Sequence, residues 1–101
     1  MSRAPAACSL SAGEAARRAE EFRELARRAL AGRERGEAEV RLRFHAGPGV
    51  TEAVEDLARR ERDCCPFLDL RVERSPGEVT LAIGAAPEDA AALDAFYELA
   101  A

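Results

Sequence analysis

FLDLRVERSPGEVTLAIG, residues 67–84, is the stretch of sequence that decides the fold. Apolar and polar residues alternate on both sides of a Ser-Pro-Gly-Glu turn at 75–78, as in two half-buried strands joined in a hairpin. The apolar face carries Leu68, Leu70, Val72, Val79, Leu81 and Ile83. We therefore predict a hairpin whose apolar face must be covered by a layer of helices.

A third strand is predicted upstream, in EAEVRLRF at residues 37–44. Ala38, Val40, Leu42 and Phe44 point to one side, and the charged residues between them point to the other, so this strand is also half-buried. The sequence AGPG at 46–49 is typical of a loop.

Helical signals surround these strands. Ser11 and Glu14 match a capping box that opens a first helix, and Gly32 is the predicted stop. A second helix is predicted from Val50 to Cys65, ended by proline at position 66. A last helix follows Pro87, which suits a first helical turn.

These elements predict an α+β fold, a two-layer sandwich in the order (β)αβαββα, with a mixed or antiparallel sheet and helices on one face. The bracketed strand is AACSL at residues 6–10. A length of 101 residues suits a single domain over 1–101. We expect residues 1–7 to be flexible.

Composition narrows the choice of partners. The net charge is −4, and opposite charges interleave along the first helix, so no basic field would attract nucleic acid. No apolar run approaches the roughly 20 residues that a membrane-spanning helix needs. The N-terminal MSRAPAACSL is too short and too weakly apolar for a secretory signal. We expect a cytoplasmic protein with reduced thiols and no membrane or nucleic-acid partner.

The chemistry concentrates in RDCCPFLDL, residues 62–70. Cys64 and Cys65 close the second helix, and Glu61 lies one helical turn before them on the same apolar stripe. A carboxylate on such a stripe needs a partner or a proton. One interpretation of Glu61 is an ion pair with a nearby arginine, for which residues 59, 60 and 62 are candidates. The other is an acid or base beside two nucleophiles.

Two adjacent thiols in a reducing compartment favour a soft metal or metalloid ion, because coordination deprotonates a thiol outright. The negative end of the helix dipole alone would raise the pKa of both thiols. We predict Hg(II), As(III) or Cu(I) bound by Cys64 and Cys65, with Cys8 as a third ligand. Structural zinc fits poorly, since the cysteines lack C-x2-C spacing and His45 is the only histidine. Cys65-Pro66 is also the Cys-Pro dipeptide seen in haem-responsive segments. A match of two residues is a very weak signal, so we rank haem binding below metal binding.

Cys8 opens a second hypothesis. It lies just before the first helix, where backbone N–H groups and the positive dipole end favour a thiolate. A sulfur carrier or thiol redox protein acting through Cys8 is therefore an alternative. If residues 6–10 form a strand parallel to 37–44, the vicinal thiols lie about 20 Å away. If the segment folds back over the second helix, all three sulfurs converge. A third hypothesis is an interaction or effector module whose cysteines only pack.

LARRERDCCPFLDLRVE (57–73) and EVTLAIGA (78–85), with CSL (8–10) ahead of a charged helix, resemble a group of small, mostly uncharacterised bacterial proteins common in actinobacteria. The sharpest shared string is E-x-x-C-C-P-F, and some similar segments accompany mercury-type MerR-like regulators. The resemblance implies a site at Glu61, Cys64, Cys65 and Cys8, and a link to mercury resistance. We expect a regulator partner or a homodimer as candidate assemblies.

Two further likenesses bear on the reaction, if there is one. A pair of cysteines with a carboxylate is similar in residue type to the set that organomercurial lyases use, in which an acid protonates the leaving carbon. The element order with a first strand is similar to that of small sulfur carriers. Those carry Cys-Pro-x-Pro, whereas Cys8 is followed by Ser9, Leu10 and Ser11. Whether the protein is an enzyme is left open.

Overall fold

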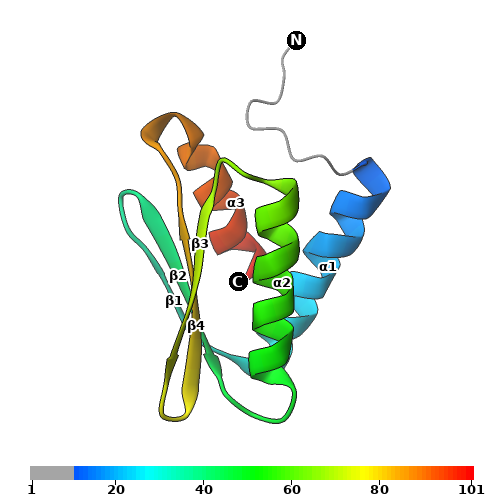
Figure 1. The fold of residues 1–101 in the computed structure, drawn as a ribbon, viewed down its shortest axis with the longest axis vertical. Helices are drawn as coiled ribbons and strands as arrows, with labels where there is room; N and C mark the ends of the chain where they lie inside the picture. Colours follow the sequence, from blue (N-terminus) through cyan, green and yellow to red (C-terminus); the bar gives the residue numbers. More distant parts are fainter. Residues whose placement is uncertain (1–10) are drawn as a thin grey trace.

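A computed structural model describes residues 11–101 and has an α+β fold with helices on one face of a four-stranded sheet (Figure 1). The predicted fold class and the two-layer arrangement are confirmed. The elements are, in order, α1 (Ala12–Ala29), β1 (Leu30–Arg35), β2 (Glu39–His45), α2 (Val50–Cys64), β3 (Asp69–Ser75), β4 (Glu78–Gly84), the 3-10 turn η1 (Pro87–Asp89) and α3 (Ala90–Leu99). The predicted strand at 6–10 and the flexibility of 1–7 lie outside the described residues.

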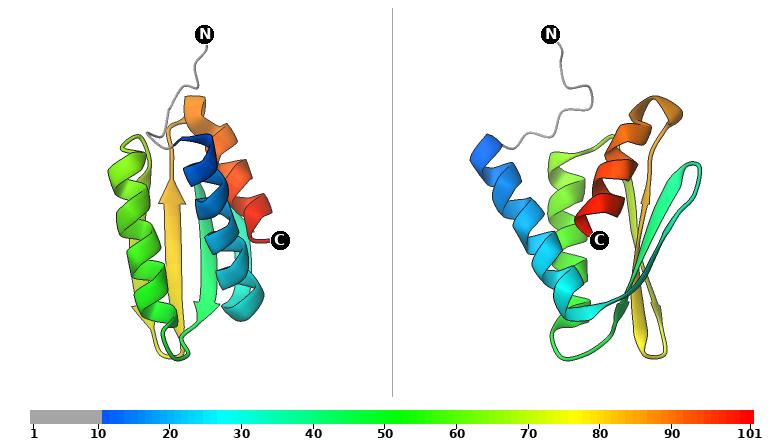
Figure 2. Two further views of the ribbon diagram at one scale, coloured as in Figure 1. Left: turned by 90° about the vertical axis from the view of Figure 1, so that its right-hand side faces the viewer. Right: turned by 180° about the vertical axis from the view of Figure 1, so that it is seen from behind.

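The sheet is antiparallel throughout, in the order β1-β2-β4-β3. The predicted hairpin is β3 and β4, and Gly77 closes its turn with a φ of +79° that favours glycine. In the central pair, Leu42 lies opposite Leu81 and Val40 opposite Ile83. These side chains are fully buried, because all three helices cover the same face of the sheet (Figure 2).

One strand was not predicted. The sequence places Gly32 at the end of a helix, but α1 ends at Ala29 and the chain enters β1 at once. Arg33 of β1 donates a hydrogen bond to the carbonyl of Tyr97 at 2.6 Å, and its guanidinium lies 3.9 Å from the ring centroid. Arg35 pairs with Asp94 of α3 at 2.9 Å. The positions of β1 that face α3 are therefore held by the arginines Arg33 and Arg35. Because these residues are charged, β1 lacks the apolar–polar alternation by which a half-buried strand is identified in a sequence.

The core lies between the helices and the sheet. α1 contributes Phe22 and Leu25, and α3 contributes Leu93 and Phe96. The rings of Phe22 and Phe96 meet edge to face with centroids 5.3 Å apart, which joins α1 to α3. Because each helix turns its apolar stripe toward this core, its rotation about its own axis is fixed. Any polar residue that lies on the same stripe therefore also faces the core.

The opposite face of the sheet is covered by paired charges that follow the cross-strand register. Ion pairs join Arg41 to Glu39 and Glu73, Arg43 to Glu34 and Glu78, and Arg71 to Glu39, Asp69 and Glu73. These pairs spread both signs across the whole face. No helix within residues 11–101 is long and apolar enough to cross a membrane.

Candidate functional site

The candidate site lies at the C-terminal end of α2. This helix packs its stripe of Val54, Leu57 and Ala58 into the core, and the same stripe carries Glu61 inward one turn later. The helix ends at Cys64, one residue before the predicted Cys65, which is the C-cap with φ −130° and ψ 71°. Pro66 follows, so the prediction that proline ends this helix is confirmed.

Glu61, Cys64 and Cys65 come together as their spacing predicts. The Cys64 sulfur lies 3.6 Å from Glu61 Oε1, and the Cys65 sulfur lies 3.9 Å from Oε2 of the same carboxylate. The two sulfurs are 3.4 Å apart, whereas a disulfide between them would need about 2.05 Å. All three residues are buried, with exposed fractions of 5, 7 and 0% for Glu61, Cys64 and Cys65.

Arg18 of α1 is the fourth member of the site. Its Nη1 donates a hydrogen bond to Glu61 Oε1 and lies 3.9 Å from the Cys64 sulfur. The side chains of Arg18 and Glu61 are 13% and 6% exposed, so this ion pair is largely withdrawn from water. We call Arg18, Glu61, Cys64 and Cys65 the thiol cluster. It joins the N-terminal half of α1 to the last turn of α2.

The sequence identified the wrong partners for Glu61. Arginines 59, 60 and 62 precede or follow it on α2, but the structure directs all three elsewhere. Arg59 pairs with Asp56, and Arg60 pairs with Asp56 and Glu21. Arg62 donates a hydrogen bond to the carbonyl of residue 70 at 3.1 Å. These side chains leave α2 on other sides of the helix, whereas Glu61 faces inward toward α1.

Arg18 could have been found from the sequence by the rule that identified Glu61. It lies four residues before Phe22, on the stripe of α1 that turns toward the core. A charged residue on an apolar stripe needs a buried partner, and each of these two stripes carries one charge of opposite sign. The missing information was which helix lies beside which.

Burial raises the pKa of the Cys64 thiol above its ordinary value, and the negative charge of Glu61 adds to this effect. The positive charge of Arg18 and its contact with the sulfur act in the opposite direction but do not reverse the shift. Cys64 is therefore a protonated thiol at neutral pH. It needs a ligand that can displace the proton before it acts as a thiolate.

Cys8 is the predicted third ligand, and His45, the only histidine, is not predicted to bind a metal. Cys8 lies outside the described residues, so its distance from Cys64 and Cys65 stays a prediction. His45 is exposed at the end of β2, opposite Glu78, and belongs to no group of metal-binding side chains within residues 11–101.

The three donor residues have spacings that suit one ion. Each of Glu61, Cys64 and Cys65 offers a ligand atom within 4.8 Å of the others. A metal bound tetrahedrally, with bonds of about 2.3 Å to sulfur and 2.1 Å to oxygen, would separate two sulfurs by about 3.8 Å and a sulfur from an oxygen by about 3.6 Å. The observed separations of 3.4 Å between the sulfurs, 3.6 Å from the Cys64 sulfur to Oε1 and 3.9 Å from the Cys65 sulfur to Oε2 are each within about 0.4 Å of these values, although the two sulfurs contact different oxygens of the carboxylate. A linear S–metal–S arrangement would need about 4.6 Å between the sulfurs.

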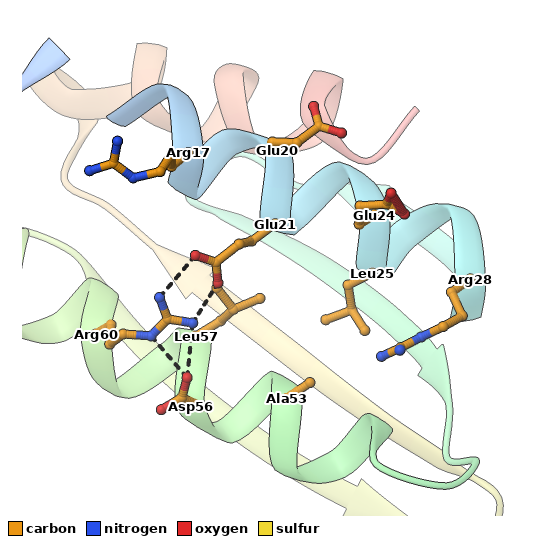
Figure 3. A pocket seen from close by; sticks show the side chains of 10 residues that line it. All are labelled: Arg17, Glu20, Glu21, Glu24, Leu25, Arg28, Ala53, Asp56, Leu57 and Arg60. Carbon is orange, nitrogen blue, oxygen red and sulfur yellow. Dashed lines mark hydrogen bonds and ion pairs between the residues drawn. The ribbon is translucent and has the colours of Figure 1, made fainter. Parts of the chain in front are cut away.

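A surface groove of about 460 Å³ follows the same pair of helices (Figure 3). Its floor is Leu25, Ala53 and Leu57, and its rim is charged. Arg60 reaches across the groove, where it pairs with Glu21 of α1 at 2.6 Å and with Asp56 at 2.9 Å. Arg60, Glu21 and Asp56 are thus paired with one another, and the thiol cluster is the stronger candidate for a binding site.

Comparisons with models of known families, with curated proteins and with solved structures found no match to this chain.

Proposed function

We propose that the protein binds a soft metal or metalloid ion through Cys64 and Cys65, with Glu61 as a third donor. The observation that carries the proposal is the meeting of two sulfurs and a carboxylate, within 4.8 Å of one another, at a buried helix end. Thiolates are the protein ligands that soft ions prefer, so Hg(II), As(III) and Cu(I) are the candidates. Binding is proposed for the protein with its cysteines reduced.

Burial supports this proposal in a second way. An ion held where the exposed fractions are 7% or less exchanges slowly with water and with competing thiols. Entry requires some opening between α1 and α2, where the Arg18 side chain, 13% exposed, donates its hydrogen bond to the carboxylate of Glu61. Cys8 remains proposed as a further thiol ligand, which would complete a four-donor set.

Ion-binding stoichiometry of the reduced full chain tests the proposal. Wild type is compared with Cys64→Ser, Cys65→Ser and Cys8→Ser by titration with Hg(II) in competition with a chelator. We expect one ion per chain in wild type and a loss of affinity of about a hundredfold or more in each of the first two variants. Asp63→Asn, an exposed neighbour of the pair, is the matched control and should bind as wild type. Equal binding by wild type, Cys64→Ser and Cys65→Ser would end the proposal.

A packing role is the second candidate, because both sulfurs belong to the continuous buried core. Under that interpretation, the double variant Cys64→Ala/Cys65→Ala loses folding stability, and wild type shows no specific ion binding. The two candidates are therefore separated by the same titration together with a urea unfolding curve.

The other expectations remain proposals. A cytoplasmic location suits thiols that must stay reduced, and the net charge of −4 argues against nucleic acid as the partner. The sulfur-carrier alternative predicts a gain of about 32 Da on Cys8 after exposure to a persulfide donor. Two further hypotheses are that Glu61 acts as an acid and that the protein forms a homodimer or binds a regulator.

A further inference from the structure

The groove between α1 and α2 has an apolar floor that the proposed function does not use (Figure 3). The floor consists of Leu25, Ala53 and Leu57, and the groove volume of about 460 Å³ lies in the range of about 300 to 1,000 Å³ that is usual for small-molecule sites. Ala53 is half-buried, and its single methyl group occupies less of the groove than a larger side chain would. The groove can therefore hold a small ligand against apolar side chains from both helices.

The charges around this floor are not all balanced. Arginines pair with every carboxylate that lines the groove, namely Glu20, Glu21, Glu24 and Asp56. Arg28 also lines the groove, and no ion pair or hydrogen bond within residues 11–101 holds its guanidinium. Figure 3 shows the Arg28 side chain directed back along the groove toward Ala53 and Leu25, whereas Arg17 points away from the floor. The uncompensated charge beside the apolar floor is therefore positive.

The floor is short, because charged side chains mark both of its ends. Arg60 pairs with Glu21 across one end at 2.6 Å, and Arg28 lies at the other end (Figure 3). The helical rise between Glu21 and Arg28 on α1 is about 10 Å, and it is the same between Ala53 and Arg60 on α2. A partner helix, itself about 10 Å wide, would have to pass over the Arg60–Glu21 pair to bury more than two turns. A thin ligand of about 10 Å fits between the two ends.

We propose that the groove binds a free medium-chain carboxylate, with its carboxylate on Arg28 and its chain along Leu25, Ala53 and Leu57. A guanidinium binds a carboxylate through two parallel hydrogen bonds, and the unpaired Arg28 supplies one beside the floor. An extended chain of about eight carbons, with bonds of about 1.5 Å, reaches roughly 9 Å, which matches the length of the floor. Burial of the chain against apolar side chains supplies the rest of the affinity. No cysteine takes part, so this site is independent of the proposed metal binding.

Isothermal titration calorimetry of the full chain, with octanoate as the probe, tests this inference. We expect wild type to bind octanoate at least about tenfold more tightly than acetate, which lacks the chain, or octylammonium, which carries the opposite charge. Arg28→Gln should weaken octanoate binding about tenfold, and Ala53→Phe, which fills the floor, should weaken it by about tenfold or more. Arg71→Gln is the matched control, because Arg71 pairs with Glu39 on the opposite face of the sheet, and it should bind octanoate as wild type does.

Absence of octanoate binding to wild type would overturn the inference. Equal binding by wild type and Arg28→Gln would also overturn it, because octanoate would then associate with the protein as an adventitious additive only. Analytical ultracentrifugation tests the other occupant of the groove. A dimer that Ala53→Phe dissociates would place a second copy of the chain there and exclude the carboxylate. Circular dichroism verifies the folding of each variant, and Arg28→Gln, at an exposed position, decides the question alone if Ala53→Phe does not fold.

Discussion

Arg18 on α1 donates a hydrogen bond to the carboxylate of Glu61 on α2, 43 positions along the chain, and the same nitrogen lies 3.9 Å from the Cys64 sulfur. This contact makes the thiol cluster a property of two helices. It also gives α1 a polar anchor near its N-terminal end, beyond the apolar contacts of Phe22 and the residues that follow.

The first prediction concerns the stability that depends on this pair. Arg18→Met should lower the free energy of unfolding by about 3 kcal/mol, because it leaves a carboxylate in a buried position without its charged partner. Arg18→Met/Glu61→Leu should recover most of that loss, since apolar residues of similar size are tolerated at such sites. Urea unfolding of the three proteins measures both effects.

A surface ion pair between the same helices provides the control. The side chains of Arg60 and Glu21 are 31% and 44% exposed, and Arg60→Met should cost less than about 1 kcal/mol. If Arg18→Met and Arg60→Met proved equally mild, burial of the Arg18–Glu61 pair would have no energetic consequence.

The second prediction concerns the pH dependence of ion binding. Burial, followed by the charge of Glu61, raises the pKa of Cys64 above its ordinary value of 9.0, so an ion must displace a proton from this sulfur at neutral pH. The apparent affinity for Cd(II), corrected for the chelator, should therefore rise about tenfold or more per pH unit between pH 6 and 8. An affinity that does not change over this range would mean that no thiol proton is displaced.

The third prediction concerns the pH dependence of folding stability. A hydrogen bond from Arg60 lowers the pKa of Glu21 below its ordinary value of 4.5. A carboxylate whose pKa is lower in the folded state stabilises the fold above its unfolded-state pKa, and this contribution is lost as the pH falls through the folded-state pKa. Glu21→Gln should therefore be less stable than wild type at pH 7, by less than about 1 kcal/mol because the pair is exposed.

This difference should shrink from pH 7 to pH 3, as protonation of Glu21 in wild type begins to remove the charge that Arg60 contacts. Unfolding curves at the two pH values measure it. A difference of the same size at both would indicate that Glu21 acts through packing and not through its charge.

The fourth prediction concerns the reactivity of Cys64. In Cys8→Ser/Cys65→Ser, Cys64 is the sole cysteine, and its low exposure and raised pKa should slow its alkylation about tenfold or more relative to a free cysteine at pH 7.5. Alkylation in urea should be as fast as that of an unstructured peptide. Equal rates with and without urea would show that the sulfur is open to solvent.

Much of the fold follows from local patterns. Val79, Leu81 and Ile83 alternate with smaller or polar residues, and this period of two predicts β4 together with its inward face. β1 was not predicted because its positions facing α3 are Arg33 and Arg35. Their guanidinium groups form a hydrogen bond and an ion pair with α3. An edge strand of this kind has no apolar period, so only the structure reveals it.

The candidate site divides in the same way. The sequence by itself determined that Glu61, Cys64 and Cys65 share one end of a helix, because residues three and four apart lie on the same helical face. Only the tertiary structure decided that Arg18 completes the thiol cluster, and that the arginines nearest Glu61 in the sequence do not. Helical periodicity fixes the geometry within α2, whereas the packing of α1 against α2 depends on how the whole apolar core is filled.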